Sequence, residues 1–224
     1  VRVAGRTLSD VRTDVLRRVG QQYRGVSRDL RLARTRGFRV YLTGQVRRPG
    51  PVAASAALRV GDVVTGAQLL GGASRRRIEV LHTDGAREAC DLDLFLQTGD
   101  ASLNPWLRDG DVIQVPSATE YLWAQGAVAR PGRYEGGVRD SLLTLLRLAG
   151  GALPAAQLNQ ALLVRFRDSF TPESLWVSLD DIYARRVNPP LEDGARLYVY
   201  YIPEYRQQHE AAIMGEVQRP GVYP

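Results

Sequence analysis

Apolar residues recur at helical spacing near the start of the chain. The residues that share this spacing are Val11, Val15, Leu16, Val19 and Tyr23. Steps of three and four residues place side chains on one face of a helix, so the pattern predicts an amphipathic helix with Thr7 or Ser9 as its N-cap. A single amphipathic helix does not fold alone, and we expect it to pack on a partner or on another part of the protein.

Beyond Gly37 the apolar residues form short runs separated by turn residues, a pattern that predicts strands. The expected strands lie at residues 40–42, 78–81, 89–92, 121–123, 162–166, 175–179 and 212–214. Two further stretches, 58–70 and 138–149, predict short helices. Asp62 and Ser141 are the expected N-caps, and the glycine pairs that follow the two stretches are the expected left-handed C-caps.

One motif, Gly-x-Val-x-Arg-Pro-Gly, occurs three times, at residues 44–50, 126–132 and 215–221. Its glycines and prolines are Gly44, Pro49, Gly50, Gly126, Pro131, Gly132, Gly215, Pro220 and Gly221. Proline presets φ and glycine accepts positive φ, so each copy predicts a strand, a tight turn and a strand. From Gly44 to Gly126 is 82 residues and from Gly126 to Gly215 is 89, so the repeating unit has the size of a small domain.

Each full repeat closes on a related segment, residues 104–116 in the first and 188–199 in the second. The order of elements is therefore hairpin, helix, hairpin, turn and strand. This order predicts an α+β fold in which tandem modules each hold one helix against a small mixed sheet. We expect modules at 38–117 and 119–203, and the start of a third, truncated module at 210–224.

Charge is uneven along the 224 residues. All 30 basic residues are arginine, and residues 1–39 carry eleven of them against three aspartates, so the net charge of +6 becomes −2 for the remainder. The repeats are thus not basic, which argues against a nucleic-acid-binding protein despite a pI near 9.8. The single cysteine, Cys90, excludes an intramolecular disulfide and a cysteine-based metal cluster. Apolar runs are too short for a membrane-spanning helix, and because the chain begins at Val1 we expect it to be part of a longer protein.

The triplicated turn, the Gly-Gly segment after each helix and the Asp-Gly turn before each last strand together resemble the SLBB (soluble ligand-binding β-grasp) domain. Tandem copies resemble the periplasmic region of bacterial polysaccharide export proteins of the Wza-like outer-membrane family. The resemblance covers residues 38–224, and 5–8 (Gly-Arg-Thr-Leu) resembles the end of that family's export domain, so 1–36 is expected to be its C-terminal remnant. Two positions depart from the pattern: Ala195 stands where the first repeat has Asp111, and Pro190 where it has Trp106.

The resemblance implies a non-catalytic role at the periplasmic face of the outer membrane. Members form ring-shaped homo-oligomers through which capsular or exopolysaccharide reaches the cell surface. The expected partners are the polysaccharide, further copies of the chain and an inner-membrane polysaccharide co-polymerase. No cofactor, metal or nucleic acid is expected.

Five side chains are candidate glycan or subunit contacts. Arg48, Arg130 and Arg219 precede Pro-Gly in the three motif copies, where a guanidinium could bind an anionic sugar or a carboxylate of a neighbouring subunit. A hydrogen bond to the backbone of the turn is the favoured alternative. Trp106 and Tyr134 could stack on sugar rings, whereas Trp123 and Trp176, in predicted strands, are expected in the core.

Other functions stay open at this stage. A stand-alone β-grasp module of the cell envelope that binds a ligand or glycan is the main alternative. A glycan-cleaving enzyme would need two carboxylates at a defined separation, but Asp109 and Asp111 lie in an ordinary Asp-Gly turn. His82 and His209 are expected to lack a triad or metal-ligand partner.

Overall fold

The computed structural model describes residues 3, 5–23, 27–33, 35–166, 171–205, 211–216, 218–219 and 221–223, the strands at 211–213 and 221–223 by their backbone alone. The chain divides into two compact units, Val1–Gly37 and Phe38–Pro224.

The first unit contains the predicted helix, α1 (Leu8–Gln22). Thr7 is its N-cap, because its Oγ1 accepts the Asp10 N–H at 3.2 Å. Asp14 forms ion pairs with Arg17, Arg6 and Arg18, and these guanidinium groups hold the pKa of its carboxyl well below the usual range.

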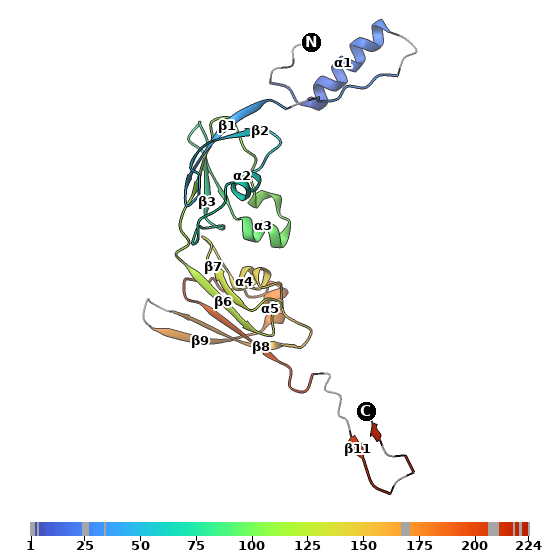
Figure 1. Cartoon of the computed structure of the whole chain (residues 1–224), viewed down its shortest axis with the longest axis vertical. Coiled ribbons are helices and arrows are strands. Elements are labelled where there is room, and N and C mark those ends of the chain that lie inside the picture. Colours follow the sequence, from blue (N-terminus) through green and yellow to red (C-terminus); the bar gives the residue numbers. More distant parts are fainter. Residues whose placement is uncertain are drawn as a thin grey trace. The chain divides into compact units, whose positions relative to one another are not determined.

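The second unit holds two five-stranded mixed sheets with the same topology (Figure 1). The first has the order β2-β1-β5-β3-β4 and the second the order β7-β6-β10-β8-β9. Their strands are β1 (Gly37–Gly44), β2 (Gly50–Ser55), β3 (Ile78–Leu81), β4 (Arg87–Cys90), β5 (Val112–Val115), β6 (Tyr121–Gly126), β7 (Gly132–Glu135), β8 (Ala156–Phe166), β9 (Pro172–Val177) and β10 (Arg196–Tyr201). In each sheet the first and last strands along the chain pair in parallel, Tyr41 with Val112 and Trp123 with Arg196. The predicted α+β architecture of tandem β-grasp modules is confirmed.

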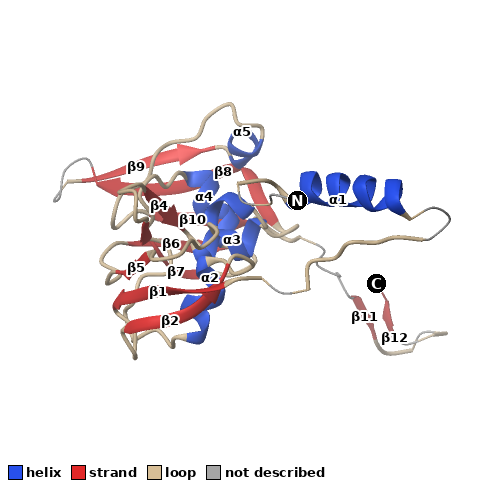
Figure 2. Ribbon diagram, turned by 90° about the horizontal axis from the view of Figure 1, so that it is seen from above, coloured by secondary structure: helices blue, strands red, loops and turns tan. Residues whose placement is uncertain are grey.

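Helices cover one face of each sheet (Figure 2). They are α2 (Val60–Gly66), α3 (Leu92–Thr98) and the 3₁₀ turn η1 (Ala101–Leu103) on the first sheet, and α4 (Leu142–Leu148) and α5 (Leu179–Tyr183) on the second. We call β1–β5 with their helices the first module and β6–β10 with theirs the second module. The sequence predicts one helix per module, but each module has a second one. Asp91 and Ser178 follow the second hairpin of their modules and are the N-caps of α3 and α5.

The helix ends differ from the prediction in the first module only. Ser141 caps α4 as expected, but Asp62 lies inside α2, where its carboxylate accepts the Arg59 N–H at 2.8 Å. Gly150 follows the C-cap of α4 with φ +78°, and the Gly151 N–H bonds to the Leu146 carbonyl, which is a Schellman ending. In the first module α2 ends before the glycine pair, and Gln68 takes the left-handed position with φ +55°.

All three motif copies form the predicted hairpins, and the third joins β11 (Ala211–Ile213) to β12 (Gly221–Tyr223). Gly44 and Gly126 have φ +87° and +80°, and a Cβ there would lie 2.0 and 1.9 Å from the carbonyl oxygens of Val115 and Val199. These two positions therefore require glycine. Pro220 lies outside the described residues.

Each module buries its own apolar core. Val40, Leu42 and Ile113 from the first sheet pack against α2. Leu163 and Leu197 from the second sheet pack against α4 and α5. Burying one such leucine or isoleucine stabilises the fold by about 1.5–3 kcal/mol. The two modules thus have separate hydrophobic cores. Polar contacts link the two modules.

Candidate functional site

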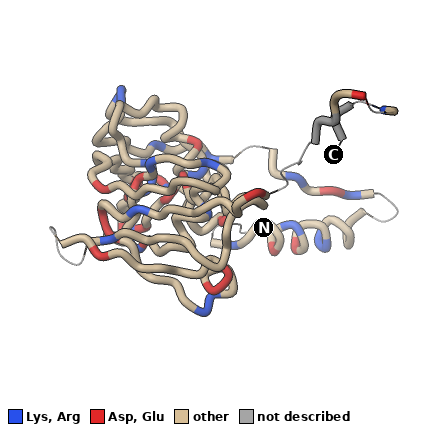
Figure 3. Tube along the Cα trace, turned by 90° about the horizontal axis from the view of Figure 1, so that it is seen from below, with Lys and Arg blue, Asp and Glu red and all other residues tan. Residues whose placement is uncertain are grey.

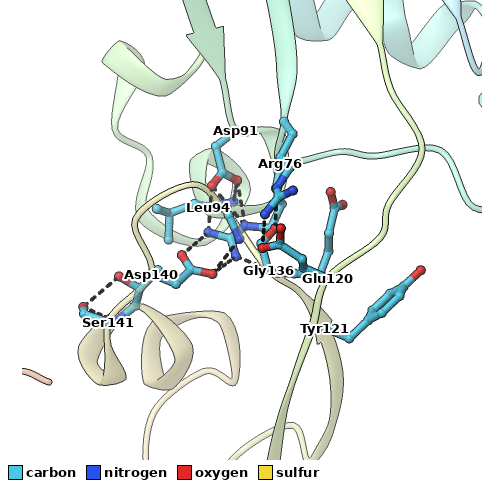
Figure 4. A network of polar contacts seen from close by, with 12 residues as sticks. Arg76, Asp91, Leu94, Glu120, Tyr121, Gly136, Asp140 and Ser141 are labelled. Carbon is cyan, nitrogen blue, oxygen red and sulfur yellow. Dashed lines mark hydrogen bonds and ion pairs between the residues drawn. The ribbon is translucent and has the colours of Figure 1, made fainter. Parts of the chain in front are cut away.

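Three consecutive arginines, Arg75, Arg76 and Arg77, bond to the second module. Figure 4 shows Arg76 between Asp91 and Asp140. The three arginines precede β3 of the first module, and the side chain of Arg76 is only 2% exposed. Its Nη1 and Nη2 donate to the two carboxylate oxygens of Asp140 at 2.6 and 2.8 Å, and Nη1 also donates to the Glu135 carbonyl at 2.6 Å. A bidentate bond of this kind fixes both the distance and the angle between its partners.

The carboxylates around Arg76 come from both modules. Asp91, the N-cap of α3, lies 2.8 Å from Arg76 Nη2, whereas Asp140 belongs to the second module and is 4% exposed. Burial raises the pKa of Asp91, and Arg76 opposes that rise. Burial also opposes the charge on Arg76, but its hydrogen bonds to Asp140 and Asp91 outweigh that effect and raise its pKa above the ordinary value.

Neighbouring contacts complete this joint. Arg77 forms an ion pair with Glu120 and donates to the Gly136 carbonyl at 3.1 Å. Glu135 accepts from the Ser74 hydroxyl and, at 2.8 Å, from the Arg75 N–H; burial raises its pKa. A buried network with its groups satisfied specifies one arrangement, even where its net contribution to stability is small. The joint therefore holds the two modules at a defined angle.

Helices α3 and α4 pack against each other between the two modules (Figure 1), and Arg130, in the second copy of the turn motif, contacts residues of both. Its Nη2 donates to the Leu148 carbonyl at 2.9 Å and to the side chain of Gln97 on α3. At this position the arginine bonds to the backbone of its own module, as the favoured alternative predicts, and to a side chain of the first module of the same chain.

Arg48, the equivalent arginine of the first module, is exposed and borders a cavity of about 660 Å³. The cavity is also lined by Pro49, Val52, Val63 and Gln68. Among the described residues, Arg48 has no hydrogen-bonding side chain or carboxylate partner. Arg219, in the third copy, is exposed as well.

The two aromatic candidates, Trp106 and Tyr134, differ in how much of their rings is accessible to a ligand. The ring of Trp106 is 52% exposed, and the Arg59 guanidinium lies 3.8 Å from its centroid. Tyr134 packs against the core of the second module, and its hydroxyl donates to the Arg130 carbonyl. Trp106 therefore has one ring face covered by a cation, whereas Tyr134 braces the turn. The structure does not bring the five candidate contacts together into one site.

The core assignment of Trp176 is wrong. Its side chain is 60% exposed on β9, and its ring centroid lies 6.0 Å from that of Tyr200 on β10. Trp123 is half-buried on the same face, with the Arg196 guanidinium 5.2 Å from its ring centroid. The alternation along β6 could have placed Trp123 correctly. Leu122 and Ala124 point to the core, so Trp123 between them points outward.

His82 has a partner that the sequence did not reveal. Its Nδ1 lies 2.8 Å from Asp111 Oδ1, and both side chains are buried. The other Asp111 oxygen accepts the Arg108 N–H at 2.7 Å. The pair closes the end of the first sheet, and its burial inside the module makes it a structural element. His209 lies outside the described residues.

No family model matches the chain. A curated relative does: the EPS I polysaccharide export outer membrane protein EpsA of Ralstonia nicotianae is 29% identical over 168 residues. The alignment covers 70% of this chain and 42% of that protein. The chain is a distant homologue of a polysaccharide export outer membrane protein. The resemblance inferred from the motifs is thereby confirmed, and the chain spans less than half the length of its relative.

The described part of this polysaccharide-export homologue has neither a metal-binding cluster nor a membrane-spanning helix. Its described residues contain no group of three or more His, Cys, Asp or Glu side chains placed to hold a metal ion. Within the same residues, no helix combines the length and the apolar character needed to cross a membrane. Acidic and basic positions are mixed along the second unit (Figure 3).

Proposed function

We propose that the chain is the periplasmic part of an outer-membrane channel that exports capsular or extracellular polysaccharide, and that it catalyses no reaction. The observation that carries the proposal is the homology to EpsA over 168 residues. In this proposal residues 38–117 and 119–203 are SLBB-type modules, 210–224 begin a third, and 1–36 end a preceding export domain.

The buried joint supports the proposal because a ring closes only when each subunit presents its contact surfaces at a fixed angle. A cyclic assembly uses a heterologous interface, in which two different surfaces of the subunit meet. An error of a few degrees per subunit accumulates around the ring. Arg76, held between Asp91 and Asp140, supplies the required rigidity between two modules with separate cores.

The exposed arginines of the turn motif, Arg48 and Arg219, are candidate contacts for the ring or its cargo. Arg130 of the second module binds Gln97 of the first module. Arg48 is the equivalent arginine of the first module, and we infer that the cavity beside it receives a side chain from a neighbouring subunit in the same way. In the same proposal Arg219 and Trp106 face the polysaccharide or a subunit. An inner-membrane co-polymerase would deliver the polymer to the ring.

The test is made in cells that lack the gene encoding the protein. We expect surface polysaccharide to disappear and polymer to be retained inside the envelope, and the complete gene to restore export. The Arg76→Ala variant should restore it poorly, whereas the matched variant Asn159→Ala, at the equivalent and exposed position of the second module, should restore it fully. Normal surface polysaccharide in the deletion strain would overturn the proposal and favour a stand-alone glycan-binding module.

A further inference from the structure

The outward face of the second sheet, opposite its helices, gathers aromatic rings and arginines. The residues of this face are Tyr121, Trp123, Arg133, Trp176, Arg196, Tyr198 and Tyr200. Their neighbours along the strands, including Leu122, Leu163 and Leu197, point into the core, so strand alternation places the named side chains outside. We call this surface the aromatic face.

Strand pairing puts the rings and the cations side by side. Trp123 on β6 pairs with Arg133 on β7 and with Arg196 on β10. The Arg133 guanidinium lies 4.3 Å from the ring centroid of Tyr121, and that of Arg196 lies 5.2 Å from the centroid of Trp123. At the far side of the sheet Trp176 and Tyr200 form a tilted ring pair, with 34° between their planes.

No carboxylate of the described residues is paired with the cations of the aromatic face. In the described residues neither Arg133 nor Arg196 forms an ion pair with a carboxylate, although many other arginines of the chain do. An arginine that stacks on a ring keeps the N–H groups at the edge of its guanidinium plane free for an anion. The face therefore offers flat apolar rings and uncompensated positive charge together.

The first module lacks this arrangement at the same positions of the sheet. Tyr41 corresponds to Trp123, but Val112 stands in place of Arg196, Gln114 in place of Tyr198 and Ala89 in place of Trp176. Because the fold is the same, the scaffold does not require the aromatic face.

We propose that the aromatic face binds an acidic polysaccharide, an inference that rests on the proposed function and names the charge class of its cargo. The apolar C–H face of a sugar ring stacks on Trp176 and Tyr200, where the rings are most exposed. A carboxylate of a neighbouring sugar accepts hydrogen bonds from Arg196 or Arg133. An exposed sheet face suits a polymer that must slide past it.

The test measures binding of two hexasaccharides of equal length to the full chain. Titration with hexagalacturonate, followed by tryptophan fluorescence, should give saturable binding that weakens as salt is added. Neutral maltohexaose should bind about tenfold or more weakly, since it cannot pair with the arginines. Trp176→Ala and Arg196→Gln should each weaken hexagalacturonate binding about fivefold or more. The matched first-module variant Tyr41→Ala should bind as tightly as the unchanged chain.

Three results would overturn the inference: no binding of hexagalacturonate, equal binding of the two hexasaccharides, or wild-type binding by both face variants with an unchanged melting temperature. A concentration-dependent dimer in sedimentation experiments, abolished by Trp176→Ala, would instead assign the face to a second copy of the chain. The export assay in cells is independent of the binding assay. If the protein restores export but does not bind hexagalacturonate, the role of the aromatic face is refuted and the proposed function is not. Normal surface polysaccharide in cells that lack the gene refutes the proposed function.

Discussion

At the turn before the last strand of each sheet, the first module buries Asp111 and the second buries Ala195. Asp111 contacts the buried His82 at 2.8 Å, whereas Arg165, which takes the place of His82 in the second sheet, bonds to Glu173 at 3.0 Å on the partly exposed hairpin. One backbone topology thus accepts a hydrogen-bonded polar pair or an apolar side chain at the same place. The comparison shows that the fold does not require one residue type at this place: the buried carboxylate has hydrogen-bond partners, and the buried alanine needs none.

The modules also differ in what they offer outward. The first contributes the arginine run that binds its neighbour, where the second has Leu158, Asn159 and Gln160. The second carries the aromatic face. The two copies of the fold therefore differ in their tasks: one carries the arginine run of the joint, and the other carries the candidate glycan surface.

The largest effect is expected when the joint is broken. Arg76→Ala should cost about 3–5 kcal/mol, because it leaves Asp140 and Asp91 buried without their cation. In urea unfolding, tryptophan fluorescence reports mainly on the second module, and labelling of Cys90 reports on the first. The two transitions should coincide in the unchanged chain and separate in the variant. Asn159→Ala is the control, and coincident transitions in Arg76→Ala would contradict the role assigned to the joint.

Breaking the buried polar pair is expected to have the next largest effect. Asp111→Ala should destabilise the first module by about 3 kcal/mol, because His82 and the Arg108 N–H lose their acceptor. Asp111→Asn keeps a carbonyl oxygen and should cost less. Urea unfolding followed by Cys90 labelling measures both. An Ala variant as stable as the unchanged chain would mean that the pair is dispensable, as it is in the second module.

A smaller gain is expected at the end of α2. Gln68→Gly should stabilise the first module by about 0.5–1 kcal/mol, since glycine adopts a left-handed φ without the cost that a side chain brings. Gly150→Gln is the reverse change and should destabilise the second module by about 1 kcal/mol or more, because its Cβ would also lie 3.1 Å from that of Ala129. Thermal unfolding measures the change in melting temperature of each variant. A change of the same sign in both variants would refute this account.

The smallest effect concerns the chemistry of Cys90 in the intact chain. Its thiol is buried, and burial raises its pKa to about 12, so the reactive thiolate is scarce at pH 8. A thiol reagent should therefore label the native chain far more slowly than the urea-unfolded chain. Raising the pH toward 10 should speed native labelling only to the extent that the module opens. Rapid labelling of the native chain at pH 8 would show that the first core is not closed around β4.

Local patterns predicted much of the architecture. The three hairpins, the Thr7 and Ser141 caps and the left-handed Gly150 all followed from residues within a few positions of one another. Gly44 and Gly126 were also predicted from local sequence, because the turn of the motif needs a positive φ at these positions. The second helix of each module was missed since five or seven residues show too little periodicity beside a hairpin.

The candidate site was less accessible to sequence reasoning. The same motif leaves Arg48 exposed, whereas Arg130 bonds to Gln97 on α3, so the sequence of the turn does not decide what its arginine contacts. Trp176 was misplaced because a strand pattern says which residues share a face, but not whether that face is covered.

By itself, the sequence determined the repeat, its turns and its α+β class, since backbone preferences and side-chain periodicity act over a few residues. The tertiary structure alone decided that Arg76 meets Asp140, that His82 meets Asp111 and that Trp176 faces outward. These pairings join residues far apart in the chain, and a buried charge takes whichever partner the packing of sheets and helices brings within hydrogen-bond distance.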